Sequence, residues 1–416
     1  MIQISTFTAL ALTASAAIVA SFTPVSAFDT QVQKSTETAS ATTLDATDSP
    51  KRADDDGSRD TSGEWTDKPI AAHRAELLTL AFEAASSLPT HPHVKNRCRM
   101  QEDVITTCLE LEQPRRALSY IEKIDNWRRG STYADLALYL ARHENAQHVS
   151  RFLELADQVA ERKTEASNQE WRIDLIKAKI AAVLVATTAE KEIVDFKARV
   201  PELDAMVYHG GLEETTRALS EYAKLYDEHY ADETRRNMLY TKVRKGWGNT
   251  PIQVRFESLS KLTETALAHD DRPTALVLAR EAREVLAAAD FVAEDRIPLI
   301  ARSAALFRRA GDPDSSKKEL DAAIALYDKH EKDIVDIYRS TALRALAEQY
   351  QELGDGDRAL TLYSRAVEAG VVNPNSRPRA DDLMAVCCSM ARCDVQPTEP
   401  LMKRLREVRA NLREPW

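Results

Sequence analysis

The stretch from Thr341 to Val371, TALRALAEQYQELGDGDRALTLYSRAVEAGV, decides the fold of this chain. Its first half carries apolar and small residues at the spacing of one helix face: Leu343, Leu346, Ala347 and Tyr350. Residues 354–356, Gly-Asp-Gly, break that pattern, because glycine permits the left-handed backbone with which helices end. The second half marks one face of another helix with Ala359, Leu360, Tyr363 and Ala366. The stretch therefore predicts two antiparallel helices joined by a tight turn.

Weaker copies of this pattern precede it near residues 101–128, 259–287 and 300–327. Each combines two runs of helical periodicity with a proline in the turn: Pro114, Pro273 and Pro313. Proline suits such a turn, since a fixed φ and a missing amide cost nothing there. Between residues 161 and 249 no register can be followed, although Trp171–Ala186 is predicted as one helix. Convincing strand alternation is absent from the sequence beyond Pro69, which predicts an all-α fold.

The segment 341–371 resembles a tetratricopeptide repeat, whose order of Leu, small residue, Tyr, turn glycine, Ala, aromatic and Ala it follows. It departs from that family at Val371, where a proline is usual. The resemblance implies a tetratricopeptide-like array of antiparallel helical hairpins, an α-solenoid, over residues 70–416. An irregular all-helical bundle is the alternative. A helix predicted near 397–413 would cap the last apolar face of the array.

The composition narrows the functional classes. Only 11 of the 416 residues are glycine, which disfavours folds that cradle dinucleotides or nucleoside triphosphates in glycine loops. The formal net charge of −10 argues against nucleic acid as a partner and against bulk attraction to anionic lipid.

The amino-terminal residues predict export. Residues 1–27 contain no charged side chain, and a short apolar run leads to Val25-Ser26-Ala27, small residues that a signal peptidase accepts. We expect a signal peptide over 1–27 and a periplasmic or secreted protein, with an uncleaved anchor as the alternative. Residues 28–69 are rich in Ser, Thr, Asp and Ala and lack apolar periodicity, which predicts a disordered linker. No stable membrane span is expected after cleavage of the leader.

No catalytic, cofactor or metal site is expected. His143 and His148 are five residues apart, so they point to different faces of a helix and cannot bind zinc together. Residues 91–93, His-Pro-His, are interpreted as a loop rather than as ligands acting with Cys98. The group Cys387, Cys388 and Cys393 lacks the second pair of ligands that a zinc site needs.

All five thiols are expected to be free. Cys98 and Cys108 lie too far apart on one helix for a disulfide, as do Cys388 and Cys393. A link between the amino-terminal and carboxy-terminal cysteines would have to join opposite ends of an open array.

The resemblance implies a function and a surface for it. Proteins of this family bind a peptide or protein segment in the concave groove lined by the first helix of each pair. The residues nominated for partner binding on that face carry both charges or an amide: Arg344, Glu348, Arg308, Glu264 and Gln351. Arg344 and Glu348 stand where family members that clamp a terminal carboxylate have Lys and Asn, so we expect an internal segment or a ligand with both charges. The alternatives are an envelope hydrolase or other enzyme with acidic residues in the concavity, and a structural protein of envelope assembly.

Overall fold

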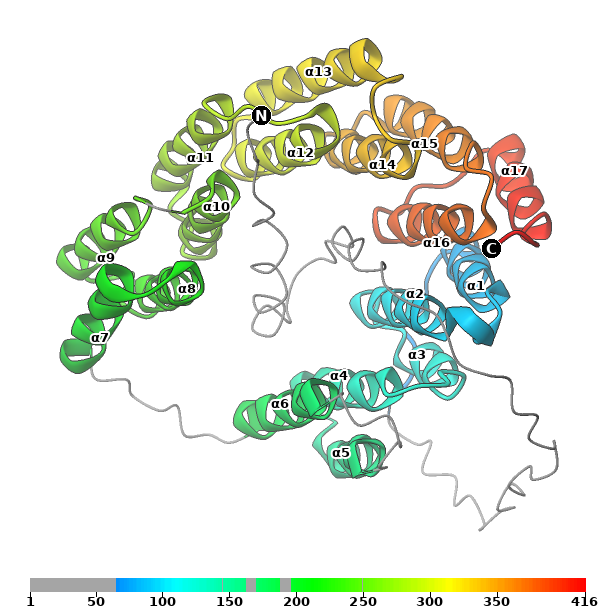
Figure 1. Ribbon diagram of the computed structural model, residues 1–416, viewed down its shortest axis with the longest axis horizontal. Helices are drawn as coiled ribbons and strands as arrows, with labels where there is room; N and C mark the ends of the chain where they lie inside the picture. Colours follow the sequence, from blue (N-terminus) through cyan, green and yellow to red (C-terminus); the bar gives the residue numbers. More distant parts are fainter. Residues whose placement is uncertain (1–64, 144, 162–169, 188–195, 249) are drawn as a thin grey trace, which may run out of the picture. The chain divides into compact units, whose positions relative to one another are not determined.

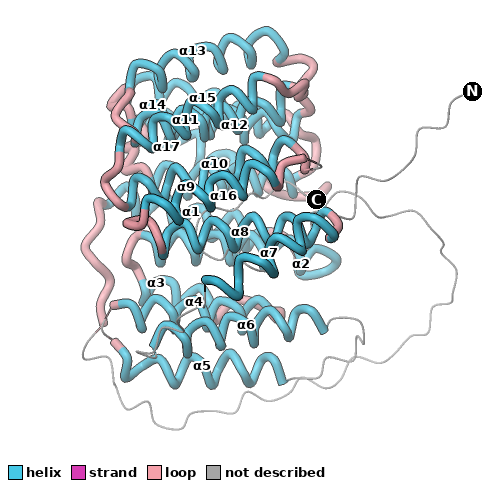
Figure 2. Tube along the Cα trace, turned by 90° about the vertical axis from the view of Figure 1, so that its left-hand side faces the viewer, coloured by secondary structure: helices cyan, strands magenta, loops and turns pink. Residues whose placement is uncertain are grey.

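The computed structural model describes residues 65–143, 145–161, 170–187, 196–248 and 250–416. Within these ranges the chain forms 17 helices and no strand, which confirms the all-α prediction (Figure 2). The expected signal peptide and almost all of the expected linker lie outside the described residues. By length and hydropathy, none of the helices in these ranges could cross a lipid bilayer.

The helices follow one another with short connections (Figure 1). Their bounds are α1 Ala72–Ser87, α2 Thr90–Glu110, α3 Pro114–Ile121, α4 Arg128–Arg142, α5 Ala146–Glu161, α6 Glu170–Thr187, α7 Phe196–His209, α8 Leu212–Glu228, α9 Glu233–Lys245, α10 Ile252–Ala268, α11 Arg272–Ala287, α12 Ala293–Arg309, α13 Pro313–His330, α14 Asp336–Glu352, α15 Gly356–Val371, α16 Ser376–Arg392 and α17 Glu399–Ala410.

The hairpin predicted at 341–371 is confirmed as α14 and α15. The residues of the predicted stripe in α14 are at most 1% exposed: Leu343, Leu346, Ala347 and Tyr350. Ala359, Tyr363 and Ala366 of α15 are completely buried, whereas Leu360 is partly exposed. Small side chains therefore let the two helices approach closely while the tyrosines fill the wider gaps.

One turn structure recurs between the helices of successive pairs. A residue with positive φ ends the first helix, at Asp270, Gly311 and Gly354. The next residue is an aspartate whose carboxylate accepts a backbone hydrogen bond from the first turn of the second helix: Asp271 from Thr274, Asp312 from Ser315 and Asp355 from Arg358. This shared turn shows that the weaker copies at 259–287 and 300–327 are built like the strong one.

The even-numbered helices form a row. From α8 to α16 each packs against the next, and α9, α11, α13 and α15 each pack against the preceding even-numbered helix. The row does not stop at α16, because α16 also packs against α2, α2 against α4, and α4 against α6. The described helices therefore form sequential antiparallel pairs, with the row running past the carboxy-terminal segment into the amino-terminal one.

The first and the last of the described helices meet at α16. Helix α1 packs along α16 in the position of a hairpin partner, and α17 lies against α15, α16 and α1. The Arg74 guanidinium donates a 2.7 Å hydrogen bond to the carbonyl of Ala391, and Arg409 lies 3.1 Å from the Glu83 carboxylate. Helix α17 is the carboxy-terminal helix expected near 397–413, and it shares the covering of α16 with α1.

The expectation that the two groups of cysteines lie at opposite ends of an open array is wrong. Because α1 and α2 pack against α16, the thiols of Cys108 and Cys388 are close enough to interact electrostatically. All five thiols are nevertheless free, and every one except that of Cys393 is buried.

The helical unit starts slightly earlier than the predicted position 70. It comprises Asp67–Trp416. The Asp67 carboxylate accepts a 2.7 Å hydrogen bond from the backbone amide of Arg115 at the start of α3, where helices attract negative charge. The Lys68 amide donates a hydrogen bond to the carbonyl of Glu112. The last residues of the expected linker therefore belong to the helical unit.

Candidate interaction site

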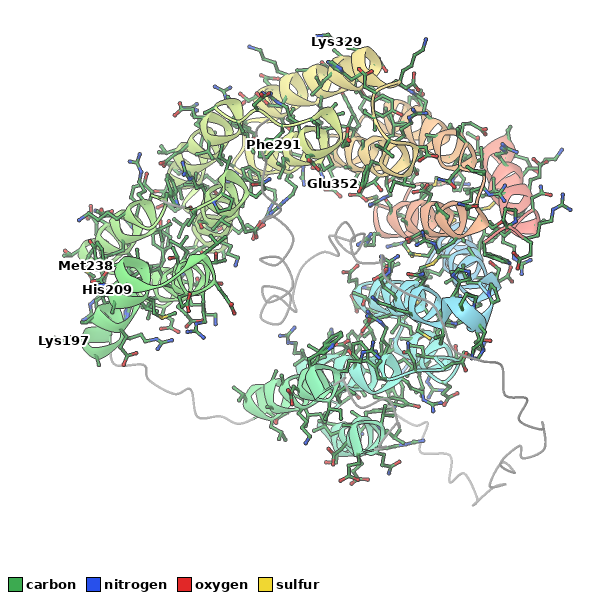
Figure 3. The ribbon with its side chains drawn as sticks, viewed as in Figure 1. Lys197, His209, Met238, Phe291, Lys329 and Glu352 are labelled. Atoms are coloured by element: carbon green, nitrogen blue, oxygen red, sulfur yellow. The ribbon has the colours of Figure 1, made fainter. Side chains whose placement is uncertain are left out.

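The residues nominated for partner binding lie along the row of even-numbered helices, and their polar groups contact neighbouring helices. Arg308 of α12 lies 3.1 Å from the Glu352 carboxylate of α14, a residue labelled in Figure 3. Glu264 of α10 lies 3.4 Å from Arg309 of α12. These ion pairs join adjacent helices of the row, so a ligand that used Arg308 or Glu264 would compete with contacts inside the chain.

Arg344 and Glu348 are bound to each other. Their side chains lie 2.8 Å apart and are only 16% and 25% exposed. The Ser389 hydroxyl of α16 donates a 2.6 Å hydrogen bond to the same Glu348 carboxylate. The Gln351 amide donates a weaker bond, 3.3 Å long, to the carbonyl of Cys393. Glu348 and Gln351 therefore hold α14 against the end of α16, and Arg344 is paired with Glu348.

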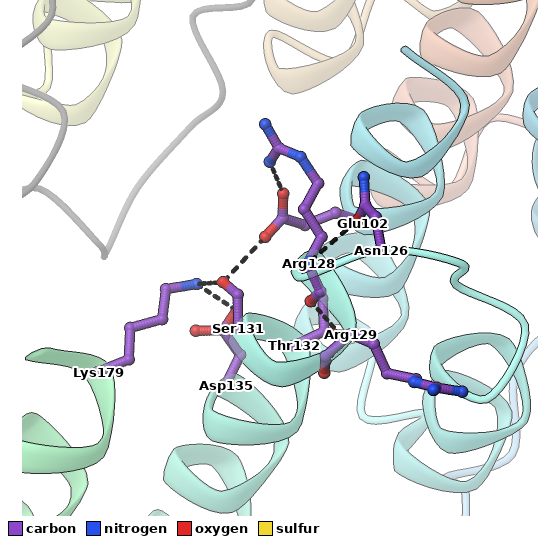
Figure 4. Close-up of polar contacts among 8 residues, drawn as sticks. All are labelled: Glu102, Asn126, Arg128, Arg129, Ser131, Thr132, Asp135 and Lys179. Carbon is purple, nitrogen blue, oxygen red and sulfur yellow. Dashed lines mark hydrogen bonds and ion pairs between the residues drawn. The ribbon is translucent and has the colours of Figure 1, made fainter. Parts of the chain in front are cut away.

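A second polar network joins α2, α4 and α6 (Figure 4). The Lys179 ammonium of α6 donates hydrogen bonds to the Ser131 hydroxyl, at 2.7 Å, and to the Asp135 carboxylate, at 2.6 Å. Ser131 in turn donates to the Glu102 carboxylate of α2, which also pairs with Arg128 of α4. The network therefore fixes three consecutive helices of the row.

This network does not have the properties of a serine–lysine catalytic pair. Burial opposes the charged form of Lys179, but Asp135 and Glu102 favour it and raise the pKa of the ammonium above its usual value. A lysine that holds its proton so firmly is a poor general base. Ser131 is also completely buried, so its hydroxyl cannot reach a substrate.

Two tryptophans and two arginines gather beside this network. The rings of Trp127 and Trp171 meet edge to face with centroids 5.5 Å apart. The Arg172 guanidinium lies over both rings, 5.7 Å and 5.4 Å from their centroids, and Arg128 lies 4.9 Å from that of Trp127. Trp171 is 56% exposed. Tryptophan and arginine are the residue types that most often dominate the binding energy of protein interfaces.

Trp171 begins an exposed apolar surface on α6, which we call the α6 face: Trp171, Ala178, Ala181, Ala182 and Val185. At about 100° per residue these positions lie on one side of the helix, opposite the buried Ile176 and Val183. Val185 is 69% exposed. Asp174 lies on the same side of α6, between Trp171 and Ala178, and Lys177 lies beside the surface; both are exposed. An apolar face of this size on a terminal member of the row is a candidate binding surface.

Sequence reasoning missed this surface although it predicted the helix. The signal was available, because residues 180–187 carry no charge, so the second half of α6 has no charged side to turn toward water. What the pattern could not show was which side of α6 the neighbouring helices cover, since that depends on α4 and α5.

Neither a cluster of metal ligands nor a cavity for a small molecule is found among the described residues. In the described ranges no three His, Cys, Asp or Glu side chains gather as metal ligands. The cavity bordered by Gly370, Asp382 and Val408 holds about 10 Å³, room for a single water at most. Neither a protein-family model nor a curated protein sequence matches this chain.

Proposed function

We propose that the protein is a non-catalytic scaffold of the tetratricopeptide-like type, which binds a protein segment. The fold supports this class, since arrays of helical hairpins present long surfaces rather than enclosed pockets. The repeated turn at Asp271, Asp312 and Asp355 and the motif at 341–371 support the resemblance to that family.

The observation that carries the proposal is the α6 face. Its apolar residues are exposed. By contrast, each even-numbered helix from α8 onward packs against two neighbours of the row or against its hairpin partner. Burying an exposed apolar side chain stabilises a complex by about 1.5–3 kcal/mol, so Trp171 and Val185 together can supply much of a binding energy. The contacts of Arg308, Glu264 and Glu348 join other helices of the row, α10, α12, α14 and α16, and not the helices that cover α6.

Affinity capture with the full mature chain tests the proposal. The wild type is compared with the double variant Trp171→Ala, Val185→Lys, and Val277→Lys is the matched control because Val277 is 60% exposed on α11. We expect one or more proteins from the native cell to be retained by the wild type and the control and lost by the double variant. Equal recovery on all three would remove α6 from the binding surface.

We propose further that the protein is exported to the periplasm or secreted. The apolar leader that ends at Ala27 supports this location. Mass spectrometry of the protein from its native cell is expected to find Phe28 as the amino terminus. Material that is soluble in the cytoplasm and begins at Met1 would contradict export.

A further inference from the structure

Helix α7 carries a second exposed face, which we call the α7 face: Ala198, Pro201, Ala205 and Tyr208. These positions lie opposite Val200 and Leu203, which are buried. Tyr208 is 68% exposed, more than the 56% of Trp171. Figure 3 labels Lys197 and His209, which mark the two ends of this helix.

The buried side of α7 is fixed to the helices that follow it. The Asp204 carboxylate accepts a 2.8 Å hydrogen bond from the Tyr222 hydroxyl of α8 and pairs with Lys242 of α9. Leu203 belongs to the same buried cluster as Tyr222. Helix α7 is therefore held on α8 and α9 with its opposite face exposed, just as α6 is held on α4 and α5 with its own face exposed.

The alternation of even-numbered and odd-numbered helices along the chain indicates which helix would pack on the α6 face. Even-numbered α10, α12 and α14 each pack against the odd-numbered helix that follows, as α4 does against α5. If α6 followed this alternation, it would pack against a helix with the sequence of α7. In the structure α6 packs against α4 and α5 while α7 packs against α8, and both faces stay exposed.

The two faces also match in spacing. When an α7 helix is laid antiparallel on α6, Val185 comes opposite Ala198, Ala182 opposite Pro201, and Ala178 opposite Ala205. The same register brings Tyr208 toward the Trp171 end of α6, with Asp174 opposite His209. Small side chains then meet in the middle, where two helix backbones can approach closely, and the aromatic rings meet at one end.

We propose that the α6 face binds the α7 face of a second copy of this chain. The inference rests on the proposed function, because it names the partner of the same surface. A second copy satisfies both faces without moving α7 away from α8 and α9, and two complementary surfaces on one chain lead to self-association.

Light scattering of the full mature chain, after separation by size over a range of concentrations, tests this inference. We expect concentration-dependent self-association of the wild type. Ala178→Arg should weaken it by about tenfold or more, because a long charged side chain would replace a methyl group where the two helices approach closely at Ala205. Ala205→Glu should weaken it similarly, and the double variant Ala178→Arg, Ala205→Glu should recover most of the loss through the new ion pair.

Val277→Arg is the control, since it places the same charge at an exposed position on α11. Circular dichroism shows whether each variant keeps its helices. A monomer at all concentrations overturns the inference, and so does self-association that Ala178→Arg leaves unchanged or that the double variant fails to restore. A monomer that still captures another protein through Trp171 would leave the proposed function in place and remove only the second copy as partner.

Discussion

The Arg99 guanidinium of α2 donates a 2.6 Å hydrogen bond to the Asp381 carboxylate of α16, although 282 positions separate the two residues in the chain. This bond lies in the interface that joins the amino-terminal helices to the carboxy-terminal ones. Because of that interface α16 is an interior member of the row, whereas α6 is covered by α4 and α5 and exposes its remaining side. The exposed apolar surface is therefore found at α6 and not at the carboxy-terminal helix.

Replacing Arg99 should weaken the interface between α2 and α16. In Arg99→Met the Asp381 carboxylate loses its partner while it still repels the nearby carboxylates of Asp103 and Asp382. We expect the free energy of unfolding to fall by about 1–3 kcal/mol, as measured by urea denaturation. Arg365→Met is the control, since its pair with Asp328 is more exposed and should contribute less than about 1 kcal/mol. Equal losses in both variants would contradict a special role for the Arg99 pair.

The same interface should make stability depend on pH. Burial raises the pKa of Asp103 to about 7, with Glu102 and Asp381 adding to the effect and Arg99 and Arg128 opposing it. Since this pKa is higher in the folded than in the unfolded chain, folding favours the protonated form, and stability should fall as pH rises from about 4 to 7. Asp103→Asn removes the titration and should be more stable than the wild type at pH 8, by up to about 4 kcal/mol. Equal unfolding midpoints of the two proteins at pH 8 would refute the assignment.

The sequence predicted the local structure well for a physical reason. The stripe through Leu343 and Tyr350 repeats with the period of a helix, and the turn at Gly354 has a backbone that few residues other than glycine adopt. Such signals act between residues close in the chain. They therefore identify hairpins even where the family motif is weak.

The long-range arrangement could not be predicted in the same way. That α1 packs along α16 depends on matching two apolar faces more than 280 residues apart, and periodicity describes each face but not its partner. The contacts of Arg344 and Glu348 could not be predicted either. On a helical wheel they lie opposite the packed stripe, yet the Ser389 hydroxyl from another pair lies against them. Whether a charged residue on α14 is free to bind a partner therefore depends on how neighbouring helix pairs pack, which periodicity does not describe.

Gly370 should be intolerant of substitution although it lies inside α15. A methyl group there would come within 2.9 Å of the Asp382 Cβ in α16, an atom fixed to the backbone. Alanine usually stabilises a helix interior relative to glycine by about 0.5–1 kcal/mol, but here overpacking should reverse the sign. We expect Gly370→Ala to lower stability by about 1–3 kcal/mol, as measured by urea denaturation. Gly248→Ala is the control, because nothing lies within 4 Å of its added methyl group.

The thiols should react slowly in the folded protein. Burial raises the pKa of Cys108 and Cys387 well above the ordinary value and that of Cys388 to about 11. The partly exposed Cys393 also has its pKa raised to about 12, by burial and by Glu348. Because the thiolate is the reactive form, titration at pH 8 should be slow before unfolding and should count five thiols after unfolding without reductant. A count of three would indicate a disulfide.

The last prediction separates structural from binding roles at Arg308. Reversing this charge places a glutamate beside Glu352, so Arg308→Glu should lower stability by up to about 1 kcal/mol and, if a partner uses this face, weaken binding as well. The exchange Arg308→Glu, Glu352→Arg restores the ion pair with its charges interchanged, and stability should return. Binding measured by calorimetry then decides the role of the residue. If the partner touches Arg308 directly, affinity stays low in the exchanged variant, because the charge at its contact is still reversed. If affinity returns together with stability, the pair only holds α12 against α14, and partner binding belongs to the α6 face alone.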